Sequence, residues 1–263
     1  MSDKTLAAPE FRATARRVVG LVQHDFLQLR RDPGPVISRL LMPVVLMVVF
    51  EPLYRATARG SGPAIVEAAP RVLVMFSMFA ISTVGAALLT ERTWRTWSWL
   101  RTTPASTWEL LAGKTLPLLG VLLLQQALVV GFARLVFGLE LAGGVALLAV
   151  AGVSWALCIL ACGALVATFA RTNNQLSSVT DVSGLLLSSL GGAVVPIALM
   201  PGWLHAVAPI SPAHWGVRAL QGALLGQTGQ ALTAAAVLTG LAVVVGAVAC
   251  WRINRYWGRP ELL

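Results

Sequence analysis

Long apolar segments separated by short polar connections occupy most of the chain. A helix needs about 20 mostly apolar residues to cross a hydrocarbon core of about 30 Å. Six segments reach or approach this length, and they are residues 36–53, 72–89, 116–137, 145–170, 182–200 and 231–251. This pattern predicts an all-α integral membrane protein, with a domain of six transmembrane helices in residues 36–263.

Composition supports a membrane environment. Hydrophobic residues make up 57% of the 263 residues and charged residues only 12%, with a mean hydropathy of +0.76. A soluble globular protein of this length needs more charges to cover its surface. The net charge of +9 would favour a nucleic-acid partner in a soluble protein. Here the distribution of charge across the membrane matters more, and no nucleic-acid partner is expected.

The basic residues are unequally divided between the two sides of the predicted bundle. With a cytoplasmic N-terminus, 15 Lys and Arg residues fall on the inner side and five on the outer side. Cytoplasmic loops carry an excess of Lys and Arg. Both termini are therefore expected in the cytoplasm, and the basic rim would attract anionic lipid headgroups by about 1 kcal/mol for each well-placed residue.

Residues 1–35 are predicted to form a cytoplasmic amphipathic connecting helix along the membrane surface. Apolar side chains recur there at steps of three and four. They are Phe11, Ala15, Val18, Val22, Phe26 and Leu29. The same stripe would also suit a helix packed on a soluble partner, because periodicity does not identify what covers it.

The connection 91–114 is rich in tryptophan and arginine. Four of the nine tryptophans lie in it, at Trp94, Trp97, Trp99 and Trp108. A short amphipathic helix over 91–100 would end near Pro104. Tryptophans prefer the headgroup region, so the segment suits an interfacial anchor. A helix-turn-helix of more than twenty residues is longer than an anchor needs, which favours a docking surface for a cytoplasmic protein.

The sequence offers no nucleotide-binding, metal-binding or catalytic motif. Gly113, Lys114 and Thr115 suggest a phosphate loop, but Trp108 stands where the motif G-x-x-x-x-G-K-[ST] requires its first glycine. Cys158 and Cys162 share a helix face without nearby histidine or acid, as small packing residues do. We therefore expect no cofactor on this chain, and any ATP chemistry must come from another polypeptide.

Polar residues within the membrane concentrate in the fifth predicted span. Gly184, Ser188 and Gly192 repeat every four residues, a spacing that lets helices approach closely. The same stripe, with its neighbouring serines, can also line a pathway. Asp181 is the acid closest to a span, and it is interpreted as a boundary charge beside Arg171.

Residues 196–229 combine an apolar composition with prolines that exclude a continuous helix. The prolines are Pro196, Pro201, Pro209 and Pro212. Short re-entrant helices that enter the outer leaflet before the last span are expected, with protein or trapped water satisfying their backbone groups.

Two groups of residues resemble a known family. The first is Glu91 and Arg92 followed by Thr96, Leu100 and residues 103–106; the second is Pro196 and residues 200–204 ahead of residues 209–212. In order and spacing they are similar to the membrane subunit of the ABC type 2 exporters, particularly the daunorubicin-resistance-like branch. Family members often carry glycine immediately before the coupling-loop threonine, where this chain has Arg95.

The resemblance implies a permease subunit without enzyme activity, in the cytoplasmic membrane of a bacterium. Two such membrane subunits, identical or related, would work with two separate ABC ATPase subunits that hold ATP and Mg²⁺. It implies that the second and fifth spans line the pathway and that an outer gate precedes the last span. The expected cargo is an amphipathic drug-like or lipid-like molecule. The alternatives are a polysaccharide or glycolipid exporter and, from another class, an intramembrane enzyme or a channel.

These expectations assign roles to particular residues. Coupling to the ATPase falls to Glu91, Arg92, Thr96, Leu100 and Pro104. Pathway lining falls to Met75, Phe76, Phe79, Ser183 and Ser188. The outer gate is formed by Pro196, Met200, Trp203 and Leu204.

Overall fold

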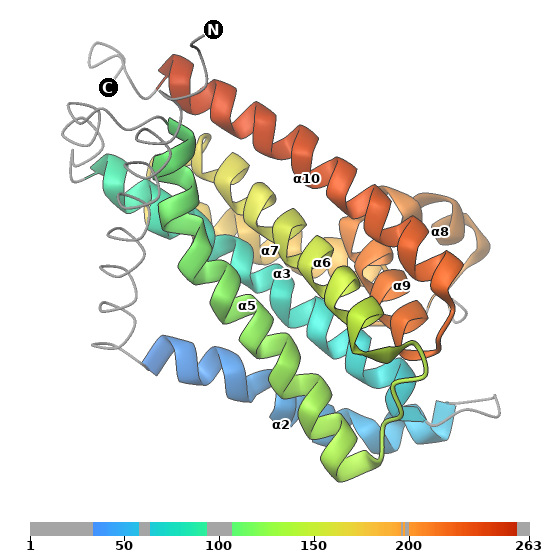
Figure 1. Ribbon diagram of the computed structural model, residues 1–263. Coiled ribbons are helices and arrows are strands. Elements are labelled where there is room, and N and C mark those ends of the chain that lie inside the picture. The colour runs from blue at the N-terminus through green and yellow to red at the C-terminus, as the bar shows by residue number, and fades with distance from the viewer. Residues whose placement is uncertain (1–33, 58–63, 94–106, 196, 198–199, 257–263) are drawn as a thin grey trace, which may run out of the picture.

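The described part of the chain folds as a bundle of helices (Figure 1). The computed structural model describes residues 34–57, 64–93, 107–195, 197 and 200–256. Its long helices are α2 (Gly34–Thr57), α3 (Ala64–Thr93), α5 (Thr107–Phe137), α6 (Gly144–Ala167), α7 (Asn173–Leu190) and α10 (Thr228–Tyr256). Between α7 and α10 lie α8 (Gly202–Val207), the 3-10 helix η2 (Ala208–Ile210) and α9 (Pro212–Leu224). Within these ranges the predicted all-α class is confirmed.

Among the described helices, four are long and apolar enough to cross a membrane. Their apolar stretches are Ile65–Thr90, Gly113–Phe137, Gly144–Ala167 and Thr228–Arg255. They correspond to the second, third, fourth and sixth predicted spans. In α2 the apolar stretch is the shorter Leu40–Val49, and α7 has 18 residues that include several serines, Thr180 and Asp181. A total of six spans therefore stays a prediction.

The fifth predicted span is displaced from its helix. The sequence favoured 182–200, whereas α7 covers Asn173–Leu190. Its start is fixed by the hydroxyl of Thr172, which accepts a hydrogen bond from the backbone N–H of Gln175 at 3.2 Å. Just past its end, Gly192 has φ +83°, a conformation that glycine adopts readily. Polar capping and a glycine turn, rather than the apolar run, set the boundaries.

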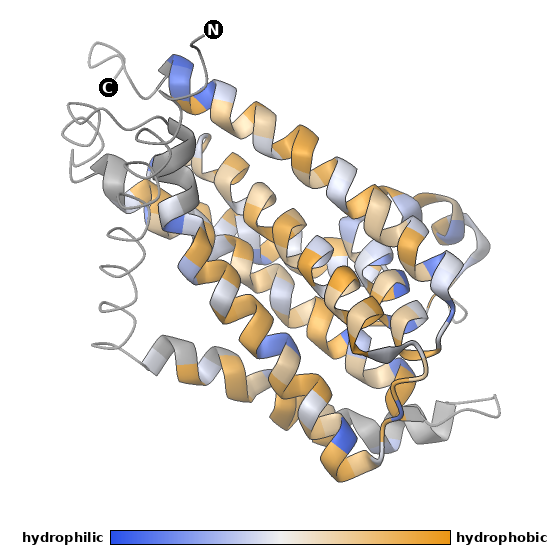
Figure 2. Cartoon of the chain, viewed as in Figure 1, coloured by the Kyte–Doolittle hydropathy of each residue, from blue (hydrophilic) through white to orange (hydrophobic). Residues whose placement is uncertain are grey.

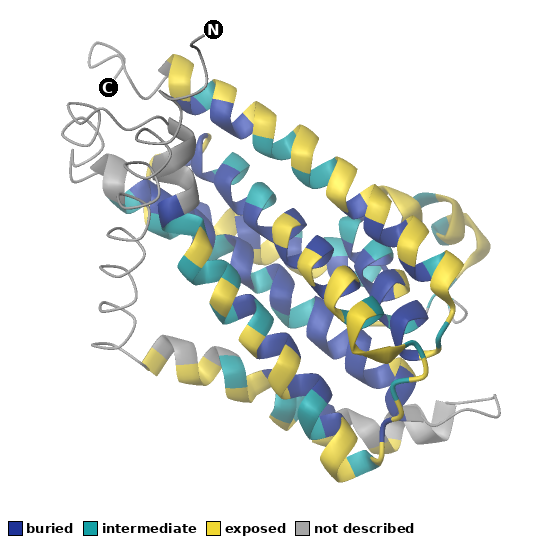
Figure 3. Cartoon of the chain, viewed as in Figure 1, coloured by how far each residue is buried: buried dark blue, intermediate teal, exposed yellow. Residues whose placement is uncertain are grey.

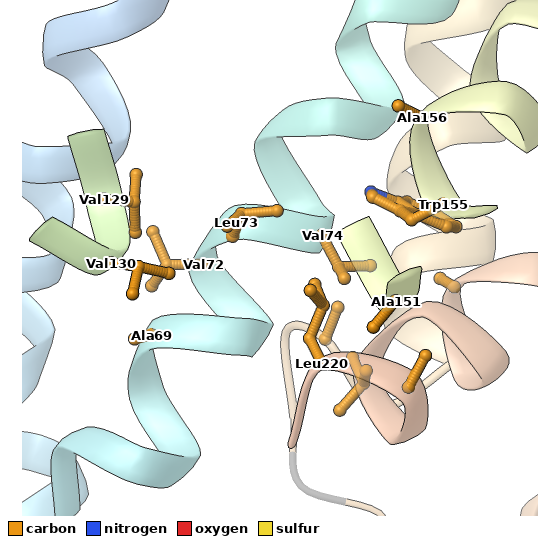
Figure 4. Packing of buried hydrophobic residues seen from close by; sticks show 14 of the residues in the cluster. Ala69, Val72, Leu73, Val74, Val129, Val130, Ala151, Trp155, Ala156 and Leu220 are labelled. Carbon is orange, nitrogen blue, oxygen red and sulfur yellow. The ribbon is translucent and has the colours of Figure 1, made fainter. Parts of the chain in front are cut away.

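Helix α3 holds the centre of the bundle, where it contacts α2, α5, α6, α7 and α9. The core around it is made of small and branched apolar side chains, with Trp155 of α6 completely buried. Figure 4 shows Val72, Leu73 and Val74 of α3 directed toward neighbouring helices. Because α3 has neighbours on several sides, a change in its position would require the helices packed around it to shift as well.

The surface of the described helices carries many apolar side chains (Figure 2). Along α10, exposed positions alternate with buried ones (Figure 3), and the side chain of Val243 is 65% exposed. A soluble monomer seldom exposes such extended apolar surface. This surface suits contact with lipid or with other membrane helices.

Glycines allow several helices to approach closely. A Cβ built on Gly163 of α6 would lie 2.6 Å from Cβ of Val84 in α3. One built on Gly216 of α9 would lie 2.7 Å from Cε3 of Trp155. No side chain fits at either distance without displacement of its neighbour. Small residues at helix contacts are typical of membrane bundles, in which close packing drives association.

Candidate transport pathway and its two ends

The predicted coupling residues fall at the C-terminal end of α3 and beyond it. Glu91 and Arg92 belong to the last turn of α3, which continues to Thr93. The sequence had placed them at the start of a separate helix. Thr96, Leu100 and Pro104 lie outside the described residues, as does most of that predicted helix. Their role in coupling stays a prediction.

Three predicted pathway residues share the middle of α3. Met75, Phe76 and Phe79 are half-buried, and Met75 and Phe76 pack against the central apolar core. The rings of Phe76 and Phe79 have centroids 6.3 Å apart and are tilted by 55°. This part of α3 therefore offers soft, partly accessible apolar surface.

The two other pathway residues are on α7, which lies against α3. Gly184 lies at this contact, and a Cβ built on it would be in ordinary van der Waals contact with the carbonyl oxygen of Met78, at 3.7 Å. Ser183 is half-buried and donates to the carbonyl of Thr180 at 3.3 Å. Ser188 is fully buried, and its hydroxyl has no hydrogen-bond partner among the described groups. The fold thus brings the second and fifth predicted spans together.

The opposite face of α7 lies on the surface of the chain. Val182, Leu185 and Leu186 are exposed there, and Asp181 is exposed on the same helix. Arg171 is also exposed, in the turn before α7. Asp181 is thus a surface residue of this chain, whereas its depth in the membrane stays a prediction.

The predicted outer gate residues occupy the segment around α8. Met200 and Leu204 are half-buried and Trp203 is 68% exposed. Pro196 lies outside the described residues. Helix α8 packs against η2, and Nε2 of His205 lies 2.8 Å from the carbonyl oxygen of Ile197. The short helices expected here are present, whereas their depth in a membrane stays a prediction.

Helix α9 packs against α10, α6, α3 and α7, a placement that the sequence did not indicate. Its cap is Ser211, whose hydroxyl accepts from the N–H of Ala213 at 3.2 Å and donates to the carbonyl of Leu187 in α7 at 2.6 Å. On the α6 side, Gly216 meets Trp155. The bond between Ala142 N–H and Leu224 O, 3.1 Å long, ties the end of α9 to the connection before α6. In the sequence, the spacing of small residues in α9 could have indicated this close packing.

The buried imidazole of α9 adds no charge to this region. Burial, with the positive charge of Arg218 as a second cause, lowers the pKa of His214. The ring is therefore neutral at pH 7. Its edge-to-face contact with Trp215, at a centroid distance of 5.4 Å, fits an aromatic packing role.

Comparison with known proteins identifies the family. The model of the ABC-2 type transporter family matches residues 16–225 of the chain. The chain belongs to this family. The match runs from the predicted connecting helix through α9, so it includes α3, α7 and the segment around α8. Together with the apolar helices, it identifies a multi-pass membrane protein of a transporter family.

Curated relatives come from two strains of one species. The "Probable multidrug ABC transporter permease YbhR" of Escherichia coli (strain K12) is 28% identical over 138 residues, which is 50% of this chain and 38% of the relative. The protein of the same name from Escherichia coli O157:H7 matches to the same extent. The chain thus spans less than half the length of these relatives.

Proposed function

We propose that the chain is the membrane-spanning permease subunit of an ATP-driven exporter. Its cargo would be an amphipathic drug-like or lipid-like molecule, taken from the cytoplasm or the inner leaflet. Membership of the ABC-2 type transporter family supports the transport role, and a relative whose name describes a multidrug permease supports the kind of cargo. The six spans of this proposal are α2, α3, α5, α6, α7 and α10, with residues 1–35 as a cytoplasmic connecting helix.

The observation that carries the proposal is the contact between α3 and α7. Half-buried Met75, Phe76 and Phe79 lie on one of these helices and Ser183 and Ser188 on the other. Thioether and aromatic groups adapt to apolar molecules of varied shape, and hydroxyls orient the polar end. Such a lining suits an amphipathic molecule better than a long, strongly hydrated glycan.

Partners complete the transporter in this proposal. No G-x-x-x-x-G-K-[ST] motif occurs in the sequence, so ATP and Mg²⁺ would bind to a separate ABC ATPase subunit. The ATPase would dock on 91–114 at the inner end of α3, through Glu91, Arg92, Thr96, Leu100 and Pro104. A second permease, identical or related, would pair with this one. The assembly would lie in the cytoplasmic membrane of a bacterium with both termini inside.

The segment 196–229 would close the outer end. Its apolar residues Met200, Trp203 and Leu204 would form the gate together with Pro196, until ATP binding rearranges the spans. The exposed ring of Trp203 is available for such a contact. In this arrangement polar groups of the cargo meet the serines of α7 before they reach the gate.

Purification and transport measurements test the proposal together. The chain is purified from its native membrane, and the co-purifying proteins are identified by mass spectrometry. We expect a stoichiometric ATPase with a phosphate-binding loop, and the complex should drive ATP-dependent uptake of an amphipathic dye into inverted vesicles. Isolation without an ATPase would contradict the proposal and favour an intramembrane enzyme or a channel. Uptake of a lipid-linked glycan instead of the dye would favour the glycolipid alternative.

A further inference from the structure

A buried glutamine lies at the midpoint of the α5 span. Gln125 is the central residue of the apolar stretch Gly113–Phe137, and its side chain is 0% exposed. Neither its Nε2 nor its Oε1 has a hydrogen-bond partner among the described groups. An amide buried in this way without partners is unfavourable by roughly 2–7 kcal/mol, depending on the reference state. Such a residue in the middle of a span calls for a functional explanation.

The adjacent glutamine shows that the fold can satisfy such a group. Nε2 of Gln126 donates to the carbonyl oxygen of Gly152 in α6 at 3.1 Å, and Gly152 lacks the side chain that would collide with this amide. The two residues look alike in the sequence but point to different neighbours. Gln126 therefore joins α5 to α6 by a hydrogen bond, whereas the amide of Gln125 forms no hydrogen bond with any described group.

Several buried or half-buried hydroxyls in α3, α6 and α10 are directed to the backbone of their own helix, unlike the hydroxyl of Ser188 in α7. Ser77 donates to the carbonyl of Leu73 at 2.7 Å, Ser154 to that of Val150 at 2.8 Å and Thr239 to that of Ala235 at 2.8 Å. A hydroxyl occupied in this way has little left for a ligand. The amide of Gln125 keeps both its donors and its acceptor available.

Packing places Gln125 beside the predicted pathway. Val129 follows it by one turn on the same face of α5 and lies on the side of α5 toward α3 (Figure 4), while α5 contacts both α3 and α2. Val130 meets Val72 of α3 in the same view. Helices α3 and α5 run in opposite directions (Figure 1). One turn later in α3 and one turn earlier in α5, Phe76 therefore comes level with the two glutamines.

Charged side chains near this level are already paired or lie on another face. Arg71 is five residues from Phe76 in α3, about 7.5 Å along the helix axis, and its guanidinium pairs with Glu67 at 3.3 Å. Asp181, midway along α7, is exposed on the face away from α3. In the four apolar stretches of the described helices, charges occur near the ends, at Glu67, Arg71, Lys114, Arg134, Arg252 and Arg255. Because Arg71 is paired with Glu67, an ionised group of a ligand at mid-depth would be left without a free counter-charge in these four stretches and would be disfavoured. An uncharged group with hydrogen-bonding capacity would instead satisfy the amide.

We propose that Gln125 is a specificity-determining residue that binds an uncharged hydrogen-bonding group of the cargo, such as a carboxamide, halfway through the membrane. The inference rests on the proposed export function and names its substrate class more closely. Binding would take place when α2 and α3 move apart from α5. In this conformation the amide is buried without a hydrogen-bond partner among the described groups. A cargo that hydrogen-bonds to it would therefore stabilise the opened conformation relative to this one.

A matched pair of dyes tests this role. The probes are two neutral amphipathic fluorophores that differ in one substituent, a primary carboxamide in one and an isopropyl group of similar shape in the other. ATP-driven uptake into inverted vesicles is measured with the intact complex of permease and ATPase. The wild-type complex should transport the carboxamide dye roughly tenfold faster, since hydrogen bonds that only one ligand can make give discrimination of this order or larger.

Two variants separate specificity from stability. Gln125→Met should reduce the preference to within about twofold, by slowing uptake of the carboxamide dye, and should raise the melting temperature, because the unsatisfied amide is removed. Gln126→Met is the matched control: it should lower the melting temperature and keep the preference.

The possible failures are distinguishable. A preference that survives in Gln125→Met, equal uptake of both dyes by the wild type, or failure of Gln125→Met to insert would overturn the inference and leave the exporter proposal standing. If the wild-type complex transports neither dye, the exporter proposal fails and the inference fails with it.

Discussion

Arg252 near the end of α10 and Thr168 at the end of α6 are joined by a hydrogen bond, with Nε donating to the threonine oxygen at 3.0 Å. The guanidinium also lies over the ring of Phe169, 3.8 Å from its centroid. Thr168 in turn donates to the carbonyl of Leu165 at 2.7 Å. The arginine therefore fastens the last span to the turn that leads from α6 into α7. A cation near a helix C-terminus is also favoured by the helix dipole.

Replacing this arginine should measure the strength of the link. For Arg252→Met we expect a loss of about 1–2 kcal/mol from the hydrogen bond and the cation–π contact. In a protein of this size that lowers the melting temperature by about 3–6 °C. Thermal unfolding in detergent is the measurement, with Arg255→Met as the control, because Arg255 is exposed and lies 5.5 Å from the Trp251 ring. Equal shifts for the two variants would contradict the link.

The contact between Gly216 and Trp155 predicts a sensitive position in α9. Gly216→Ala places a Cβ within 2.7 Å of the buried indole, and overpacking of this kind destabilises by about 1–3 kcal/mol. Gly240→Ala in α10 is the control. No atom lies within 4 Å of its added Cβ, so the better helix propensity of alanine should stabilise by about 0.5–1 kcal/mol.

A second substitution checks the cause. In a Trp155→Leu background, Gly216→Ala should destabilise much less, because the smaller side chain leaves room for the methyl group. Thermal unfolding of the four proteins gives the coupling between the two sites. Additive effects would mean that something other than the indole limits the size of residue 216.

The sequence predicted the long spans well and the boundaries of α7 poorly. Four of the predicted spans coincide with helices long and apolar enough to cross a membrane, because bilayer thickness requires long apolar runs, and such runs are visible without knowledge of the packing. In α7 the apolar run starts later than the helix, which begins at the polar cap of Thr172. Local hydrogen bonding decided the start, and the turn at Gly192 decided the end.

Candidate site residues could be predicted only where the residue type itself suggests a role. Met75, Phe76 and Phe79 were predicted from residue type, position and the family resemblance, and their role in a pathway stays a prediction. Gln125 was missed, because two consecutive glutamines give no indication which of them finds a partner. That difference depends on the position of Gly152, 26 residues further along the chain than Gln126. The packing of α9 against several helices likewise depends on contacts between segments that are distant in the sequence.

Cysteine labelling tests the predicted orientation. In a background without the native cysteines, Gln227→Cys should react with an impermeant thiol reagent in intact cells, and Asn173→Cys should react only after the membrane is opened. Both positions are exposed, before α10 and at the start of α7 respectively, so neither is protected by its own fold. The reverse labelling pattern would overturn the arrangement inferred from the charge asymmetry.

Substitutions at the inner end of α3 test the proposed coupling. Glu91→Ala combined with Arg92→Ala should leave insertion intact and weaken association with the ATPase about tenfold or more, because buried charge pairs at interfaces contribute strongly. Co-purification with the ATPase is the measurement.

The control for this variant removes the same two charge types at the predicted outer side. Arg134→Ala combined with Glu140→Ala changes two exposed residues, one in the last turn of α5 and one in the connection to α6, and should leave the association unchanged. Poor insertion of the Glu91 and Arg92 variant, with normal ATPase binding by the inserted fraction, would assign these residues to folding instead.

The anchoring of α9 at both ends determines how the outer side of the molecule can move. The carbonyl of Leu187 receives both the N–H of Gly191, at 2.8 Å, and the hydroxyl of Ser211, at 2.6 Å, while Leu224 is held by Ala142. A shift of α7 must therefore carry α9 with it and pull on the connection before α6. Helix α9 would then move together with α7 and the connection before α6, and would not move independently of them.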